Sequence, residues 1–347
     1  MTWWIAILAF LLALLGTPLF AILALAALVA FWLQDIGTAS VSAEMVRLAT
    51  SPVLIAIPLF TFAGYLFSES RTPERLVRLT RAAFGWIPGG LALVAMVACA
   101  LFTAFTGASG VTIVAMGGLL MPVLLKDGFK ERFSLGLLTT SGSLGLLFPP
   151  SLPLIIYSYV AMSSAGGLTL DPAQAPSVDR LFLAGILPGI FLIAVLGLLS
   201  VRQGVVQAGG RTAFRLGELF HALREAIWEV PLPFIILGGI YGGKLTVTEA
   251  AAVTALYALI VEVFVYRDIP FRRLNGIVRE SMTLVGGILV ILAAALGLTN
   301  FLIDAEVPLK ILEAIQGMVT SRLGFLLLLN AFLLVVGCLM DIFSALI

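Results

Sequence analysis

The sequence predicts an all-α polytopic membrane protein, and its composition carries most of that prediction. Hydrophobic residues make up 61% of the 347-residue chain, charged residues only 11%, and the mean hydropathy is +1.14. A soluble domain would carry roughly a quarter charged residues. Apolar stretches close to the length that spans a bilayer recur from one end of the chain to the other. The net charge of +1 argues against a nucleic-acid partner.

The two termini and the cysteines add less. The first residues contain no basic run, so we expect a first membrane helix and not a cleaved signal peptide. The last segment ends inside a hydrophobic run, which indicates either a truncated chain or a missing element. Cys99 and Cys338 lie in apolar segments and suggest neither a disulfide framework nor a metal site. We expect apolar segments at 3–33, 53–68, 84–125, 133–160, 181–201, 230–243, 250–266, 281–303 and 323–347.

Basic residues gather in four of the connecting loops, which together hold 15 of the 20 Lys and Arg. The loop 161–179 contains Asp171 and Asp179 but no Lys or Arg. The positive-inside rule therefore makes the four basic loops cytoplasmic and loop 161–179 external. The four loops carry Arg71, Arg75, Arg78 and Arg81; Lys126, Lys130 and Arg132; Arg202, Arg211, Arg215 and Arg224; and Arg267, Arg272, Arg273 and Arg279.

Segment 84–125 has a basic loop at each end, so both of its ends are expected on the cytoplasmic side. Two full crossings would need about 40 apolar residues and a turn. A re-entrant hairpin fits better, with arms at 88–104 and 111–124 and a tip at 105–110, inside the stretch "TAFTGASGVT" (103–112). Non-helical backbone at membrane depth is tolerated only where it is buried in protein or lines a polar cavity. The tip is therefore a candidate site.

The next segment, "LLTTSGSLGLLFPPSLPLIIY" (137–157), combines Gly, Ser and a double Pro and predicts a broken helix. The ends of half-helices offer free carbonyl groups to a cation and free amides to an anion. The alternative is a kinked helix packed through small residues. In the second half, segment 281–303 crosses outward and segment 323–347 re-enters from outside, which is typical of inverted repeats.

At these residues the sequence resembles the large membrane subunit of the tripartite ATP-independent periplasmic (TRAP) transporters. The matching stretches run in family order, although the family's second broken helix is absent. They are "IPLFTFAGYLF" (57–67), "TGASGVTIVAMGGLLMP" (106–122), "SGSLGLLFPPSLPLIIY" (141–157), "LFLAGILPGI" (181–190), "VTEAAAV" (247–253) and "GCLMDIFSA" (337–345).

The resemblance implies an elevator-type, sodium-coupled importer of organic acids in the bacterial inner membrane, and not an enzyme. It also implies a small four-helix membrane subunit and a periplasmic substrate-binding protein as partners. The expected domains are 1–83 (scaffold), 84–160 (transport domain, first repeat), 161–280 (scaffold) and 281–347 (transport domain, second repeat).

The site residues follow from the breaks in the apolar segments. The substrate carboxylate is expected near the half-helix ends, and sodium ions near the hydroxyl and carbonyl groups. For Asp341 the alternative is a structural aspartate that only bonds backbone amides. The substrate residues are Pro149, Pro150, Ser151 and Ser141, and the sodium residues are Thr106, Gly107, Ser109, Gly110, Thr112, Thr139, Gly142, Thr299, Asn300, Gly337 and Asp341.

Other readings of the sequence stay open or are weak. A sodium–anion symporter without a binding protein, and a channel or structural membrane partner, are the alternative functions. The stretch "GGIYGGKL" (238–245) nearly matches a P-loop, but Leu245 stands where Ser or Thr should bind magnesium. Thr246 and Glu249 have the spacing of a capping box.

Two predictions concern the cytoplasmic surface. Residues 71–86 are expected to form an amphipathic interfacial helix, with Leu76, Leu79 and Phe84 toward lipid. Glu262 lies five residues before Arg267, so we expect its side chain to reach the cytoplasmic surface.

The charge pattern predicts that positions 78, 130, 215 and 272 are cytoplasmic and that position 171 is external. Single-cysteine variants labelled in intact cells with a membrane-impermeant reagent test this topology. Labelling of position 171 alone is the expected result. Labelling of position 130 from outside would overturn the re-entrant interpretation of segment 84–125.

Overall fold

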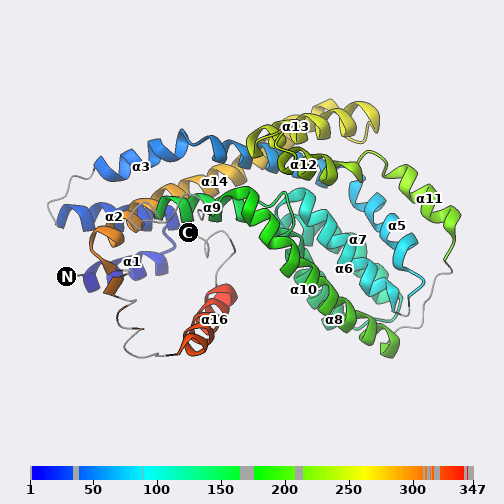
Figure 1. Cartoon of the computed structure of the whole chain (residues 1–347), viewed down its shortest axis with the longest axis horizontal. Helices are drawn as coiled ribbons and strands as arrows, with labels where there is room; N and C mark the ends of the chain where they lie inside the picture. Colours follow the sequence, from blue (N-terminus) through cyan, green and yellow to red (C-terminus); the bar gives the residue numbers. More distant parts are fainter. Residues whose placement is uncertain are drawn as a thin grey trace. The chain divides into compact units, whose positions relative to one another are not determined.

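A computed structural model of the chain describes residues 2–33, 39–87, 89–164, 176–207, 214–307, 309–310, 313, 315, 321–339 and 342. Within these ranges all regular structure is helical (Figure 1). The longer elements are α1 (Thr2–Leu14), α2 (Leu19–Leu33), α3 (Ala39–Ala49), α4 (Ala56–Glu69), α5 (Thr72–Phe84), α6 (Gly90–Thr106), α7 (Ser109–Lys126), α8 (Glu131–Leu144), α9 (Leu152–Ser164), α10 (Val178–Gln207), α11 (Leu216–Glu225), α12 (Pro231–Tyr241), α13 (Val247–Leu259), α14 (Phe271–Asp304) and α16 (Arg322–Leu339).

The described helices confirm the predicted fold class of an all-α polytopic membrane protein. Five helical segments are long and apolar enough to cross a bilayer, and a bent helix pair makes a sixth if it counts as one span. The five are Pro52–Glu69, Ser109–Lys126, Val178–Val206, Val247–Val265 and Phe271–Asp304, and the bent pair is Glu131–Leu147 with Leu152–Met162.

The chain divides into two compact units, and each is described by itself. One comprises residues 1–51, 160–171 and 284–347, and the other residues 52–159 and 172–283. The division into fixed and moving domains that the sequence suggests stays a prediction.

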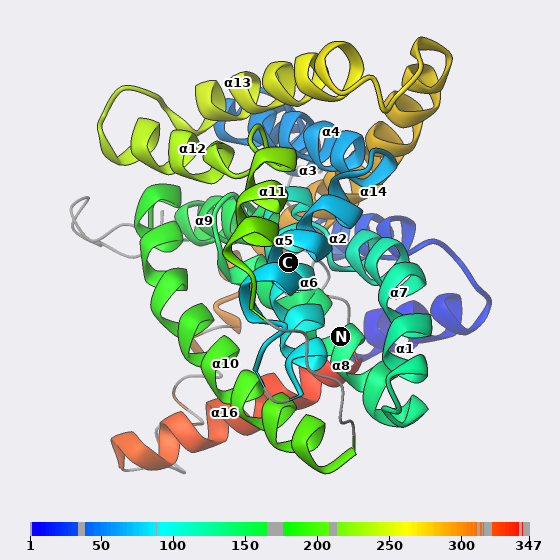
Figure 2. The same cartoon turned by 90° about the vertical axis from the view of Figure 1, so that its right-hand side faces the viewer.

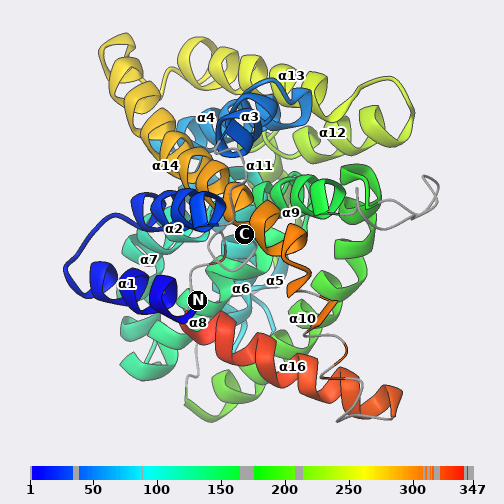
Figure 3. The same cartoon turned by 90° about the vertical axis from the view of Figure 1, so that its left-hand side faces the viewer.

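In the first unit, the apolar segment 3–33 is not one helix. It forms the hairpin of α1 and α2 (Figure 3), which meet around Gly16 and Pro18. Gly16 adopts a positive φ of 76°, which side chains disfavour, and Pro18 cannot continue a helix from the preceding turn. In the same unit, the ring of Phe31 meets that of Phe301 edge to face, with centroids 5.5 Å apart.

The second unit is built around α6, which packs against α4, α5, α7, α8 and α10 (Figure 2). Most side chains of α6 are small, and Ala92, Ala95 and Ala98 have no exposed surface. Small residues let helix backbones approach closely where lipid gives no hydrophobic driving force. The residues on α6 are therefore held from several sides.

Glycines of α10 bring its backbone against the break between α8 and α9. A Cβ atom at Gly185 would lie 2.4 Å from the carbonyl oxygen of Leu147, and one at Gly189 would lie 2.7 Å from the Phe148 ring. Both distances are too short for any larger residue without a shift of the neighbour. The glycines of "AGILPGI" are thus required by the packing of this break.

Local signals in the sequence also fixed the start of α13. Thr246 accepts a hydrogen bond from the backbone N–H of Glu249, and the Glu249 carboxylate accepts one from the Thr246 N–H at 2.7 Å. This is the predicted capping box, and it is confirmed. The helix then passes into a π-helical turn, Ile260–Val265.

The prediction for α5 was partly wrong. The helix is amphipathic, but it packs against α6 and α11, and Leu76 is buried instead of facing lipid. Thr72 and Thr80 are buried as well. One of the three side chains expected to face lipid, Leu76, is therefore an internal contact of this unit.

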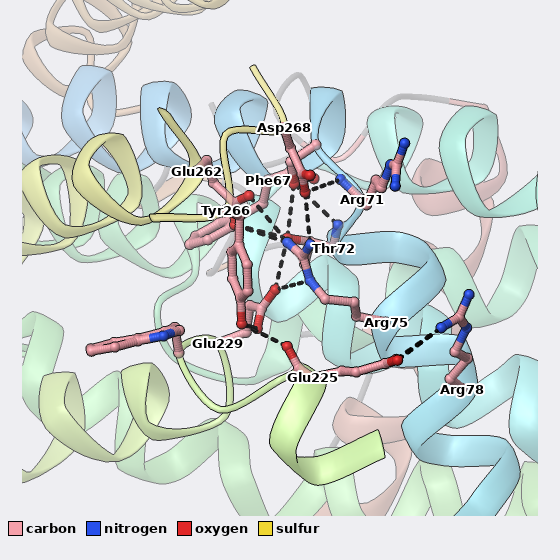
Figure 4. Close-up of polar contacts among 12 residues, drawn as sticks. Phe67, Arg71, Thr72, Arg75, Arg78, Glu225, Glu229, Glu262, Tyr266 and Asp268 are labelled. Carbon is pink, nitrogen blue, oxygen red and sulfur yellow. Dashed lines mark hydrogen bonds and ion pairs between the residues drawn. The ribbon is translucent and has the colours of Figure 1, made fainter. Parts of the chain in front are cut away.

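Arg75, also on α5, lies at the centre of a buried ion cluster (Figure 4). Its Nε donates a short hydrogen bond to Glu229, which precedes α12. Its Nη2 lies 3.1 Å from Glu262 Oε2, and its Nη1 lies 2.7 Å from Asp268 Oδ2. Glu262 has no exposed surface, so the prediction that it reaches the cytoplasmic surface was wrong. The Glu262 carboxylate is instead paired with the Arg75 guanidinium inside the protein.

The cluster contains one cation and three carboxylates, so its groups must share hydrogen bonds to remain buried. Burial alone would lower the pKa of the Arg75 guanidinium, but Glu229, Asp268 and Glu262 together raise it above its ordinary value. The guanidinium also stacks on Tyr266, with its Cζ 3.9 Å from the ring centroid. Burial, and then the Glu229 charge, raise the pKa of the Tyr266 hydroxyl, which therefore stays protonated as a donor.

Replacement of Arg75 by Met should destabilise the fold strongly, because it leaves the buried carboxylates without their cation. We expect a loss of about 3–5 kcal/mol, seen as a large drop in the unfolding temperature of the purified protein. Arg78→Met on the same helix removes an exposed pair to Glu225 and should cost less than about 1 kcal/mol. Equal effects of the two substitutions would show that the cluster contributes no more than a surface ion pair.

Candidate functional site

The predicted hairpin is present as α6 and α7, and its tip is a short turn. Helix α6 ends at Thr106, Gly107 follows with a left-handed φ of 64°, and α7 begins at Ser109. A Cβ atom at Gly107 would lie 2.8 Å from the Leu152 side chain, the first residue of α9. The turn thus needs glycine for its backbone and for its contact with the next half-helix. The tip predicted at 105–110 is confirmed as a turn.

The break predicted in segment 137–157 is confirmed as well. Helix α8 ends at Leu144, a 3-10 turn follows at Gly145–Leu147, and α9 begins at Leu152, bent by 52° from the first half. The Pro149–Pro150 bond in this linker is cis. A Cβ atom at Gly145 would lie 2.2 Å from the carbonyl oxygen of Ala100, so the break rests directly on the backbone of α6.

Three buried threonines join the hairpin to the broken helix, and we call them the hydroxyl cluster. Thr103 Oγ1 lies 2.8 Å from Thr112 Oγ1 and 2.9 Å from the carbonyl oxygen of Gly142 on α8. Thr106 Oγ1 lies 3.2 Å from Thr112 Oγ1. All three threonines are at most 2% exposed. The structure therefore brings the predicted residues Thr106, Thr112 and Gly142 together.

The hydroxyl cluster has more oxygen atoms than protons. Its three hydroxyl groups contact the carbonyl oxygens of Cys99, Gly142 and Ala108, at 2.8, 2.9 and 3.2 Å for the shortest contacts. Each hydroxyl can donate a single proton and accept through its lone pairs. A concentration of neutral oxygens of this kind is the ligand chemistry that hard cations prefer.

Ser141, next to Gly142, has a hydroxyl oxygen that is buried and has no hydrogen-bond partner in the structure. The residue is 1% exposed. Buried polar atoms are nearly always hydrogen-bonded, so an orphaned hydroxyl indicates a ligand, an ion or a water molecule that completes it. It is the clearest structural sign of a binding position in this region.

The first turns of α9 and α7 differ in how their backbone N–H groups are hydrogen-bonded. The hydroxyl of Ser151 bonds the carbonyl group of Leu146 and accepts from the N–H of Leu154 at 3.4 Å, which caps α9. Helix α7 has no side-chain cap at Ala108. Its first turn, at Gly110 and Val111, borders a cleft of about 430 Å³ that Ser68 and Glu69 also line. The amino end of α7 is thus the more open anion position.

Ser109 and Thr139 are the other predicted hydroxyl residues of the second unit, and they differ in exposure. Ser109 is half-buried, and its carbonyl oxygen would lie 3.6 Å from a Cβ atom at Gly142. Thr139 is exposed and bonds its own helix at Leu135, 2.9 Å away. Thr299 and Asn300 on α14, and Gly337 on α16, belong to the first unit. Asp341 lies outside the described residues.

The sequence analysis missed Thr103. A signal was available, because Thr103 and Thr106 are three residues apart and so share one face of a helix. The distance of 2.9 Å to Gly142, 39 residues further on, could not be read from local spacing.

A polytopic helical membrane protein with a helical hairpin against a broken helix has the general form of a membrane transporter. The family model described as "Tripartite ATP-independent periplasmic transporter, DctM component" matches residues 6–347. The chain belongs to this family, as the resemblance predicted.

Several relatives have names that state which compound they transport. The chain is 34% identical over 83% of its length to the C4-dicarboxylate TRAP transporter large permease protein DctM of Rhodobacter capsulatus, covering 66% of that protein. It is 32% identical over 88% of its length to the ectoine TRAP transporter large permease protein of Halomonas elongata, covering 69% of it. It is 32% identical over 85% of its length to the isethionate TRAP transporter permease protein DctMQ of Oleidesulfovibrio alaskensis, covering 45% of that protein. The chain thus spans about two thirds of the length of the first two relatives and less than half of the third.

Thr103→Val should destabilise the second unit, since it keeps the side-chain shape but leaves partners on three helical segments without their hydrogen bonds. The expected loss is about 1–3 kcal/mol, measured as a lower unfolding temperature. Thr139→Val is the matched control, because its hydroxyl is exposed and bonds only its own helix. An unfolding temperature unchanged by Thr103→Val would mean that the hydroxyl cluster adds nothing to stability.

Proposed function

We propose that the chain is the large membrane subunit of a sodium-coupled TRAP transporter that imports a small organic acid by an elevator motion. Family membership supports the transporter class. The observation that supports the coupling most is the hydroxyl cluster beside the orphaned Ser141 hydroxyl. Neutral oxygen ligands held between a hairpin and a broken helix suit a monovalent cation at the half-helix ends.

Sodium would be held near the hydroxyl cluster by Ser141 and the carbonyl groups at the tip of the hairpin. This keeps Thr106, Thr112 and Gly142 from the predicted set and adds Thr103. Thr299, Asn300, Gly337 and Asp341 stay predictions of a second half-site. The elevator motion itself is an implication of the resemblance.

The substrate class is a small molecule that bears a carboxylate or a similar anionic group. The names of the three relatives refer to C4-dicarboxylates, ectoine and isethionate. We place the anionic group at the uncapped amino end of α7, near Gly110, where amides and the helix dipole favour negative charge. Glu69 on the same cleft is paired with Arg273 at 2.9 Å, which reduces its repulsion. Pro149, Pro150 and Ser151 stay predicted substrate residues, whereas Ser141, predicted to bind the substrate, is proposed here for the sodium site instead.

The proposed partners are a small four-helix membrane subunit and a periplasmic binding protein, with the chain in the bacterial inner membrane. One relative, named DctMQ, is less than half covered by this chain, which is compatible with two subunits in one polypeptide there. A symporter without a binding protein, and a channel, are the alternative functions.

The proposal predicts uptake that depends on a sodium gradient and on the binding protein, and not on ATP. The measurement uses the protein and its small membrane subunit in proteoliposomes, with a labelled dicarboxylate and the purified binding protein outside. Uptake without the binding protein would favour the simple symporter. Uptake that is unchanged in sodium-free buffer would exclude sodium coupling, and flux in both directions without any gradient dependence would favour a channel.

Ser141→Ala tests the ion site directly. The Ser141 hydroxyl has no partner in the structure, so its removal should leave the unfolding temperature unchanged. If the hydroxyl binds sodium, the variant should need about tenfold more sodium for half-maximal uptake, because mass action must replace the lost binding energy. Ser143→Ala is the matched control, since Ser143 is an exposed residue of the same helix and its loss should leave the sodium dependence unchanged. A sodium dependence like that of the unmodified protein would remove Ser141 from the site.

A further inference from the structure

A cleft of about 550 Å³ lies between the second half of α5 and helix α11, away from the proposed transport site. Three arginines line it, namely Arg78, Arg81 and Arg215, together with the aromatic rings of Trp86 and Phe214. The two rings meet nearly edge to face, with centroids 6.3 Å apart, and both side chains are about half exposed. Basic and aromatic side chains at the end of a membrane protein's apolar region mark the level of the lipid headgroups.

The cleft keeps a surplus of positive charge. Arg78 Nη1 lies 2.9 Å from Glu225 Oε2, and Arg215 Nη1 lies 3.4 Å from Glu218 Oε1. Arg81 is exposed, and its guanidinium makes no ion pair or hydrogen bond with the described part of the chain. Three cations therefore face two carboxylates, and Arg81 is the one that is not neutralised.

Helix α11 presents an apolar stripe on the face opposite to the residues that line this cleft. Leu216, Phe220 and Leu223 are 72%, 71% and 42% exposed, and Ile227, just beyond the helix, is 54% exposed. Their spacing of four, three and four residues places them on one helical face. His221, by contrast, lines the cleft. A helix with one exposed apolar face and one charged face is typical of an element that lies in the membrane interface.

We propose that this cleft, held at the membrane interface by helix α11, binds the headgroup of an anionic phospholipid of the cytoplasmic leaflet. The lipid phosphate bonds the guanidinium groups of Arg81 and Arg215, which suit phosphate oxygens in pairs. The acyl chains leave the cleft against the half-exposed rings of Trp86 and Phe214. The charge pattern places this region on the cytoplasmic side, where anionic lipids attract basic residues.

The test is a lipid titration of the full-length purified chain by native mass spectrometry, with phosphatidylglycerol and phosphatidylcholine compared. Arg81→Gln should lower the affinity for phosphatidylglycerol about fivefold, the factor that corresponds to about 1 kcal/mol per basic residue. Its affinity for phosphatidylcholine should fall less, because the choline cation offsets the charge of the same phosphate group. The matched control is Arg132→Gln, an exposed arginine of α8 that does not line the cleft. Phe214→Ser, which removes a ring that lines the cleft, should weaken the binding of both lipids.

Three results would overturn the lipid site. Equal losses in Arg81→Gln and Arg132→Gln would show attraction without a site. Complete competition by glycerol phosphate would show that the cleft takes a soluble phosphate compound and not a lipid. The absence of any preference for phosphatidylglycerol in the unmodified chain would leave the cleft to a protein partner. Because lipid binding is measured without transport, each result is independent of the proposed function.

Discussion

The buried guanidinium of Arg75 is the constraint on which the second unit depends most. It links α5 to carboxylates as far as 193 residues away along the chain, on three separate segments. A buried charge of this kind is stable only while its partners stay in place. Close hydrogen bonds and ion pairs must offset the free-energy cost of removing the charge from water. The geometry of α5 is therefore set by segments from the other end of the unit. The carboxylates also accept hydrogen bonds from the hydroxyl groups of Thr72 and Tyr266 and from the backbone N–H of Arg71.

The position of α5 then determines that of the hairpin. Its buried face, with Leu76 and Thr80, packs on α6, whose own side chains are small and enclosed. Helix α6 carries Thr103 and Thr106 of the hydroxyl cluster. The packing of α5 on α6 therefore links the position of the hydroxyl cluster to that of the ion cluster. The two clusters differ in chemistry. The first satisfies charges by pairing, whereas the second concentrates neutral oxygens with few protons, and the hydroxyl of Ser141 has no partner.

Features with a local cause could be predicted from the sequence, and features with a distant cause could not. Gly107 and the Pro149–Pro150 pair break helices where they stand, and the capping box is complete within four residues. The break near Gly16 had the same kind of signal and was overlooked. Glu262 is different, since its cation lies 187 residues earlier. It also sits in a π-helical turn, where the 3.6-residue period no longer gives the direction of a side chain. Thr103 needed its contact with Gly142 to be recognised.

The contact between α4 and the hairpin bears on how a transport motion could occur. A Cβ atom at Gly64 would lie 2.6 Å from the backbone of Thr106, so the two helices touch at the tip of the hairpin without a side chain between them. The sequence-based division assigns α4 to the scaffold and α6 to the moving domain. If the hairpin moves by itself, this close contact between backbones must slide or separate. If α4 and α5 move with it, the Arg75 cluster extends the moving body to α13, because Glu262 and Glu229 are bound to the same guanidinium. In the proposed elevator motion, the ion cluster would therefore set how large a body moves as one piece.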